Sequence, residues 1–244
     1  RAVPPAPSLL AKQPIDFHVI RSSVALVRGT MHIPRLYLAI MSISFFWAVG
    51  SVLFIQFPPL VKNVLTADKS VASLFLAIFS IGIAIGSIAI NRLLAGHVSA
   101  KYAPPSVIGM GCCIIAFHVV CDLWTPAPGG QMLPLAGFLA HPMAIPLSLC
   151  LLGVATFGGM FVVPLYAFLT TTVEKCEAAR TVAANNIVNS GAMVVGSLIA
   201  IGLTLAGLEV VYQLLLVAAM CLPCAWLAWR LHKACDGPAC SGEL

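Results

Sequence analysis

Six stretches of the chain stay apolar for long enough to cross a lipid bilayer as helices. The hydrocarbon core is about 30 Å thick and a helix rises about 1.5 Å per residue, so a span needs roughly 20 apolar residues. None of the stretches alternates apolar and polar positions, as the strands of a membrane β-barrel do. The pattern predicts an all-α membrane protein with six transmembrane helices, over residues 36–55, 70–91, 102–121, 144–170, 181–205 and 210–229.

Prolines and glycines mark where these spans should begin and end. Pro58 and Pro59 predict a firm stop to the first span, and Pro104 and Pro105 predict the start of the third. Residues 123–143 are too rich in proline and glycine for a continuous helix. They predict an extracytoplasmic loop that lies partly in the membrane interface.

Small residues also occur inside the spans. Gly82 and Gly86 lie four residues apart in the second span, a spacing that lets another helix backbone approach closely. The fourth span contains Gly158, Gly159 and Pro164, which interrupt the helical hydrogen-bond ladder. These three residues predict a kinked helix, and a role in gating is a hypothesis.

The residues before the first span have a different, amphipathic pattern. Phe17, Ile20, Val24, Val27 and Met31 recur at spacings of three and four, which is one face of a helix flanked by basic residues. The pattern favours a helix lying on anionic headgroups; a soluble linker helix is the alternative. We therefore divide the chain into a cytoplasmic linker (1–34), a transmembrane unit (35–233) and a cytoplasmic tail (234–244).

Composition and charge agree with a membrane protein and predict its orientation. The chain is 60% hydrophobic and 9% charged, with a mean hydropathy of +1.02, so lipid should be its main solvent. Lysine and arginine collect in short cytoplasmic loops. Lys62 and Lys69 fall on one side of the six spans, and on the other side are Arg1, Lys12, Arg21, Arg28, Arg35, Arg92, Lys101, Lys175, Arg180, Arg230 and Lys233.

This asymmetry puts both termini in the cytoplasm. The net charge of +5 then reports membrane topology, because the pattern shows no basic groove or aromatic platform for nucleic acid. The start of the chain lacks the apolar core of a signal peptide.

The sequence offers little for catalysis or metal binding. It contains no nucleophile elbow, P-loop or zinc-protease motif, and no acidic residue near the middle of a span. Cys221 and Cys224 have metal-like spacing but no second ligand pair. His118 lies inside a span, and its three-residue separation from Asp122 differs from the acyltransferase pattern. We expect neither an enzyme nor a bound cofactor or metal.

Three asparagines open the fifth span and are its most unusual feature. Asn185 and Asn189 share a helical stripe with Ala192 and Gly196, and Asn186 lies beside it. An amide in hydrocarbon is costly without hydrogen-bond partners, so this stripe should face protein or a cavity. Two interpretations stay open: the amides bond neighbouring helices, or they contact a substrate headgroup.

Two segments resemble a known family. Residues 79–96 and 179–195 are similar to segments of bacterial lysophospholipid transporters in the major facilitator superfamily. The second family segment reads approximately R-x-x-A-A-N-N-I-x-N, and its positions are occupied by Arg180, Ala183, Ala184, Asn185, Asn186, Ile187 and Asn189. The basic loop after Gly82 and Gly86 is a degenerate form of one that the superfamily repeats in each half.

The resemblance implies the C-terminal six-helix half of a transporter in the bacterial inner membrane. Its expected activity is moving lysophospholipid, chiefly the ethanolamine type, from the outer to the inner leaflet for reacylation. A single half cannot enclose an alternating-access cavity, so we expect a partner half with six more helices. Membrane lipids are further partners, and an acyltransferase or acyl-ACP synthetase is another, because family members occur fused to these enzymes.

Two basic residues are candidates for the lipid phosphate. Arg180 is predicted near the cytoplasmic mouth, and Lys175 could assist it; the alternative is that both only set topology. Two other functions compete with the lysophospholipid reading. One is facilitator transport of a drug or small metabolite, and the other is a non-transporting scaffold that anchors an enzyme.

Overall fold

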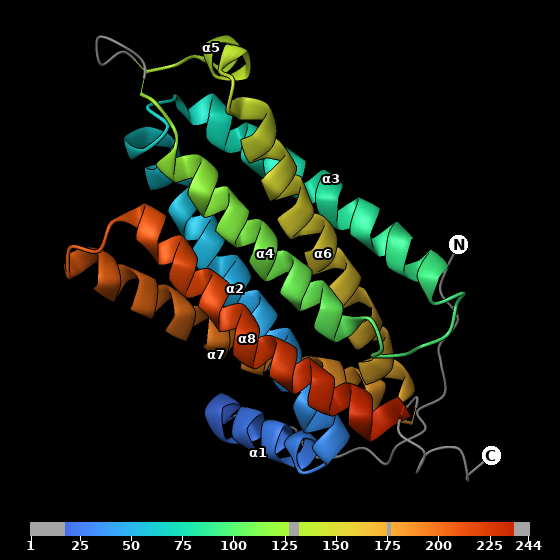
Figure 1. Ribbon diagram of the computed structural model, residues 1–244. Helices are drawn as coiled ribbons and strands as arrows, with labels where there is room; N and C mark the ends of the chain where they lie inside the picture. The colour runs from blue at the N-terminus through green and yellow to red at the C-terminus, as the bar shows by residue number, and fades with distance from the viewer. Residues whose placement is uncertain (1–17, 127–131, 175–176, 237–244) are drawn as a thin grey trace, which may run out of the picture.

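The computed structural model describes residues 18–126, 132–174 and 177–236 (Figure 1). Within them it contains eight helices and one isolated pair of bridged residues. The helices are α1 (Val19–Met31), α2 (Pro34–Asn63), α3 (Lys69–Leu93), α4 (Ala103–Asp122), α5 (Leu135–Ala140), α6 (Ala144–Thr171), α7 (Ala178–Leu205) and α8 (Val210–Asp236).

Six of these helices are long and apolar enough to cross a membrane: α2, α3, α4, α6, α7 and α8. They match the six predicted stretches in order and approximate extent, so the predicted all-α membrane protein with six spanning helices is confirmed. Pro104 and Pro105 lie in the first turn of α4, as expected for residues that need no helical N–H partner.

The predicted stop at Pro58 and Pro59 is wrong. Both residues lie inside α2, which continues to Asn63. Two prolines remove only two backbone donors, and the helix resumes beyond them, with the Val64 amide donating to the Leu60 carbonyl at 3.0 Å. The first span therefore runs well past residue 55.

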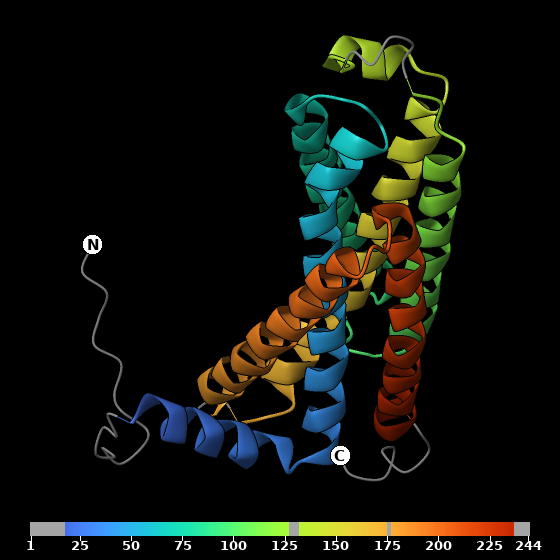
Figure 2. The same ribbon diagram turned by 90° about the vertical axis from the view of Figure 1, so that its left-hand side faces the viewer.

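Basic side chains separate between the two ends of the bundle. The end that carries α1 also carries Arg21, Arg28, Arg35, Arg92, Lys101, Arg180, Arg230 and Lys233, whereas Lys62 and Lys69 lie at the end that carries α5 (Figure 2). On α8, Lys233 Nζ lies 3.9 Å from the centre of the Trp229 ring. Such Trp–cation pairs are typical of a membrane interface.

Helix α1 lies across one end of the bundle beneath α7 (Figure 2). Val27 and Met31 of α1 line a shallow apolar hollow together with Ile187 and Val188 of α7. Ile20, on the remainder of the same face, is 82% exposed. The amphipathic face thus extends beyond its contact with α7, as expected for a helix in a lipid interface; Phe17 lies outside the described residues.

The segment between α4 and α6 caps the opposite end. It contains the short helix α5, so the predicted loop is partly helical in the described residues. Trp124 is buried there and stacks on Phe138 and on His141, with ring centres 5.5 and 3.8 Å away. Aromatic packing therefore holds this connection against the bundle.

The spanning helices pack in a pattern that repeats. Helix α2 packs against α7 and α8, and helix α6 packs against α3 and α4. Helices α4 and α8 also pack against each other. If α2, α3 and α4 are exchanged with α6, α7 and α8 in that order, each of these contacts maps onto another contact of the set or onto itself.

Helices α3 and α6 approach each other closely. A Cβ atom added at Gly86 would lie 2.0 Å from the Thr156 carbonyl oxygen, and one at Gly82 would lie 2.5 Å from Ala155 Cβ. From the other side, a Cβ at Gly159 would lie 2.6 Å from the Ile83 carbonyl oxygen. Glycine on both helices thus makes the contact possible.

We expect Gly86→Ala to destabilise the protein by about 1–3 kcal/mol, because its methyl group overlaps a backbone oxygen that cannot move without shifting α6. The matched control is Gly191→Ala on α7, where nothing lies within 4 Å of an added Cβ. That change should be neutral or stabilising, since alanine favours helix over glycine by about 1 kcal/mol. Thermal unfolding in detergent measures both, and equal melting temperatures for the two variants would contradict the packing described.

Candidate functional site

Five polar side chains from three helices meet inside the bundle. Ser44 and Trp47 come from α2, Tyr166 from α6, and Asn185 and Asn189 from α7. The Ser44 hydroxyl donates to Asn189 Oδ1 at 2.7 Å, and Trp47 Nε1 donates to the Tyr166 hydroxyl at 3.0 Å. We call these five residues the polar cluster.

The Tyr166 hydroxyl is the centre of this cluster. Besides Trp47, it accepts from Asn189 Nδ2 at 3.3 Å and from Asn185 Nδ2 at 3.5 Å. Three N–H groups therefore converge on one oxygen, which has two lone pairs. The two longer contacts are correspondingly weak.

One acceptor in the cluster has no partner. Asn185 is fully buried, and its Oδ1 makes no hydrogen bond within the described residues. A buried acceptor left unpaired costs about 1–3 kcal/mol. Such a group is rare in a folded protein and needs a donor, which a water, a ligand or, with the amide turned over, the Tyr166 hydroxyl would supply.

The helical register of α7 explains which asparagines are buried. Asn185 and Asn189 lie one turn apart and, with Gly196 and Ala200, form the stripe that packs on α2. A Cβ at Gly196 would lie 3.3 Å from the Ala48 carbonyl oxygen, so the helices come close there. Asn186 lies off this stripe and is exposed.

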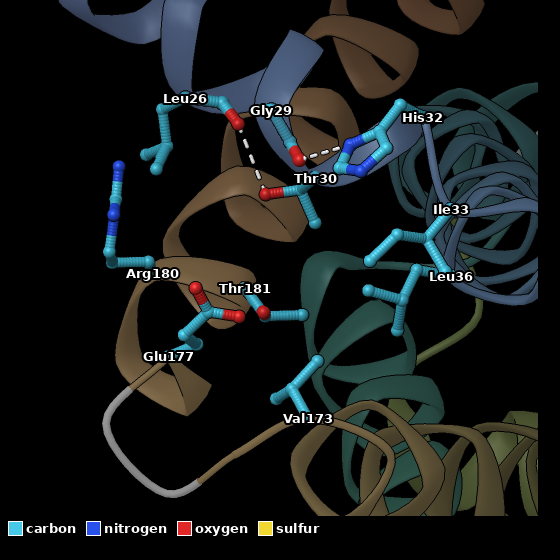
Figure 3. A pocket seen from close by; sticks show the side chains of 10 residues that line it. All are labelled: Leu26, Gly29, Thr30, His32, Ile33, Leu36, Val173, Glu177, Arg180 and Thr181. Atoms are coloured by element: carbon cyan, nitrogen blue, oxygen red, sulfur yellow. Dashed lines mark hydrogen bonds between the residues drawn. The ribbon is translucent and has the colours of Figure 1, made fainter.

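A small cleft of about 120 Å³ opens at the α1 end, and none of the five residues of the polar cluster lines it (Figure 3). Its walls come from the C-terminal part of α1, the start of α2 and the first turn of α7. Arg180, Glu177, Thr181 and His32 line it, so it presents charges of both signs. Arg180 is exposed at its rim, and Lys175 lies outside the described residues.

The residues predicted to act in packing or gating lie at separate places. Gly82, Gly86 and Gly159 form the α3–α6 contact, whereas a Cβ at Gly158 would face the Phe46 ring of α2 at 3.0 Å. Pro164 is buried inside α6, which continues through it, and lines a cavity of about 100 Å³ beside the α3–α4 connection. The structure therefore does not bring these five residues into one site with the asparagines, whereas Gly196, the sixth residue predicted to act in packing, lies on their stripe of α7.

A second polar group lies nearer the α5 end. Gln56 Nε2 on α2 donates to Gln213 Oε1 on α8 at 2.7 Å, and Gln213 Nε2 donates to the Leu208 carbonyl at 3.0 Å. On α4, His118 Nδ1 lies 2.8 Å from the Val211 carbonyl oxygen, so this histidine has a partner. These contacts join α8 to α2 and α4.

Sequence reasoning did not find Ser44, Trp47 and Tyr166. They stand among other polar-capable residues in apolar spans, and serine, tryptophan and tyrosine are common there without any shared function. A usable signal is that a buried asparagine in a membrane needs partners on a neighbouring helix. That signal gives the need for partners but not their identity, which depends on how α2 and α6 pack.

The chemistry available in the polar cluster is hydrogen bonding by amide, hydroxyl and indole groups. Comparison of the chain with protein-family models, with curated proteins and with solved structures finds no match. The geometry of these residues therefore carries the functional argument.

We expect Tyr166→Phe to lower the free energy of unfolding by about 1–3 kcal/mol, because three buried N–H groups lose their shared acceptor. Tyr37→Phe removes the same hydroxyl from an exposed position on α2 and should change stability little. Unfolding of the purified chain in detergent provides the measurement. Equal losses in the two variants would argue against a hydrogen-bonded cluster.

Proposed function

We propose that this chain is the C-terminal six-helix half of a major facilitator superfamily transporter that moves lysophospholipid from the outer to the inner leaflet. The bacterial inner membrane would hold it, with both termini in the cytoplasm. The observation that carries the transporter part is the repeated packing of α2–α4 and α6–α8. Each triplet has three spans, so consecutive triplets enter the membrane from opposite sides, as inverted transporter repeats do.

The outer face of α7 supports a partner half. Ala183, Asn186 and Ser190 follow one another at spacings of three and four, and all are exposed. Asn186 lies eight residues into α7, about 12 Å along it. Its neighbours Ile187 and Val188 line a hollow with the interfacial helix α1, which puts Asn186 near headgroup level. We infer that this polar face lies at the cytoplasmic mouth of a water-filled cavity between two halves.

The two-sign cleft supports a zwitterionic headgroup. Lysophosphatidylethanolamine carries a phosphate and an ammonium group, and Arg180 and Glu177 offer the opposite charges at one rim. Asn185 lies one to two turns further along α7, is buried and does not line this cleft. Its free Oδ1 would accept from an ammonium or glycerol hydroxyl only in a second conformation that opens the contact between α7 and its neighbours. The acyl chain would lie against the apolar walls or in lipid.

The test is uptake of labelled lysophosphatidylethanolamine by spheroplasts that lack their own lysophospholipid transporter. We expect uptake when the chain is expressed together with its partner half. No uptake would contradict the substrate, and uptake of a drug or small metabolite instead would favour the first alternative. No transport of any solute by a folded, inserted complex would favour the scaffold.

Asparagine-to-leucine changes test the polar cluster in the same assay. Leucine has nearly the shape of asparagine, so Asn185→Leu should insert and fold but lose most uptake, because it removes the free acceptor. Asn63→Leu makes the same chemical change at the exposed end of α2 and should retain uptake. Full uptake by a folded Asn185→Leu protein would contradict a role for this residue in binding.

A further inference from the structure

An apolar groove with a charged rim lies at the α5 end, far along the bundle from the polar cluster. Its volume is about 450 Å³, within the roughly 300–1,000 Å³ range of small-molecule sites. The lining side chains come from the end of α2, the start of α3 and the connections at this end: Pro58, Val61, Lys62, Ala67, Asp68, Lys69, Ala72 and Met132.

The two lysines of the groove lie at the opposite end of the bundle from the other described lysines and arginines. Among the described basic residues, Lys62 and Lys69 lie at the α5 end and the others at the α1 end. Both line this one groove, and both are exposed. The positive charge of this end is thus concentrated at the rim of an apolar hollow.

The order of charge and apolar surface matches a lipid. Pro58 precedes Lys62 by four residues on α2, and Ala72 follows Lys69 by three on α3, so each pair shares a helix face. Helix α2 runs toward the α5 end and α3 runs away from it. On both helices, therefore, the lysine lies at headgroup level and the apolar residue lies one turn deeper.

Asp68, which also lines the groove, is held by its own helix. Its carboxylate accepts from the Ser70 hydroxyl and from the Ser70 amide, the latter at 2.7 Å, and these bonds hold its pKa below the ordinary value. One negative charge against two positive ones leaves the rim with a net positive charge.

The far side of the groove is fixed by backbone hydrogen bonds. The Asp68 amide donates to the Leu133 carbonyl at 3.0 Å, and the Leu133 amide donates to the Thr66 carbonyl at 2.7 Å. These bonds hold Met132 beside the α2–α3 connection. The groove is therefore formed before any ligand arrives, which reduces the entropy lost on binding.

We propose that this groove binds a phosphate-bearing membrane lipid from the leaflet at the α5 end. The phosphate lies between Lys62 and Lys69, and the acyl chain lies along Pro58, Val61 and Ala72. Positive side chains at headgroup level next to an apolar slot are the combination that recognises anionic lipids. The site is independent of transport, and the predicted topology makes its leaflet the outer one.

Photolabelling tests the proposal on the purified chain in a maltoside detergent, which contains no phosphate. The probe is lysophosphatidylglycerol with a photoreactive acyl chain, and the labelled residues are mapped by mass spectrometry. We expect label within residues 58–72 or on Met132. A monoacylglycerol with the same photoreactive chain should label these residues about tenfold less, because it lacks the phosphate.

Charge variants separate this site from general attraction to basic residues. Lys62→Gln with Lys69→Gln should reduce labelling of the groove about tenfold, because both lysine–phosphate interactions are lost. Arg92→Gln with Lys101→Gln makes the same charge change at the other end and should leave it unchanged. Equal labelling by the two probes, or equal losses in the two double variants, would overturn the proposal.

A steric variant keeps the test decisive if the lysine variant fails to fold. Ala72→Leu narrows the slot, retains both lysines and lies at a partly exposed position of α3. It should also lose groove labelling by the phosphate-bearing probe. Unchanged labelling in a folded Ala72→Leu protein would overturn the placement of the acyl chain.

Discussion

A polar side chain inside a bilayer must find its hydrogen-bond partners within the protein, and α7 carries two asparagines that need them. Asn189 meets this need through Ser44 of α2 and Tyr166 of α6. Asn185 meets it only in part, because its Oδ1 has no partner in the described residues. Helix α7 is therefore positioned by a few directional bonds to α2 and α6, and one buried acceptor is left over.

The contacts of α3 have a different physical basis. Helix α3 joins α6 through glycines that let the two backbones touch, with Gly86 against Thr156 and Gly159 against Ile83. The equivalent contact in the second triplet is between α7 and α2. It combines the close approach at Gly196 with the hydrogen bond from Ser44 to the Asn189 side chain. The two triplets thus share a packing pattern but differ in what stabilises it. Close packing holds α3 against α6, whereas hydrogen bonds contribute to the contact between α7 and α2. Those hydrogen bonds weaken in the presence of water or a polar ligand.

The sequence was sufficient for the spans, their order and the buried stripe of α7, because length and helical periodicity depend on local pattern alone. The predicted helix stop at Pro58 and Pro59 was wrong, because whether a proline ends a helix depends on what surrounds the freed carbonyl groups. The sequence could not identify Ser44 and Tyr166 as partners of Asn189, because both lie on other helices and their contact with Asn189 depends on how α2 and α6 pack. Lys175 lies outside the described residues, so its role stays a prediction.

The proposed two-half transporter would have a water-filled passage along the exposed polar face of α7. Cysteine labelling in membranes tests it directly: Asn186→Cys and Leu198→Cys are both exposed positions of α7, the first on the polar face and the second on an apolar one. With a water-soluble maleimide and mapping of each cysteine by mass spectrometry, we expect modification of Asn186→Cys in the assembled transporter and protection of Leu198→Cys. Protection of both positions would contradict the proposal.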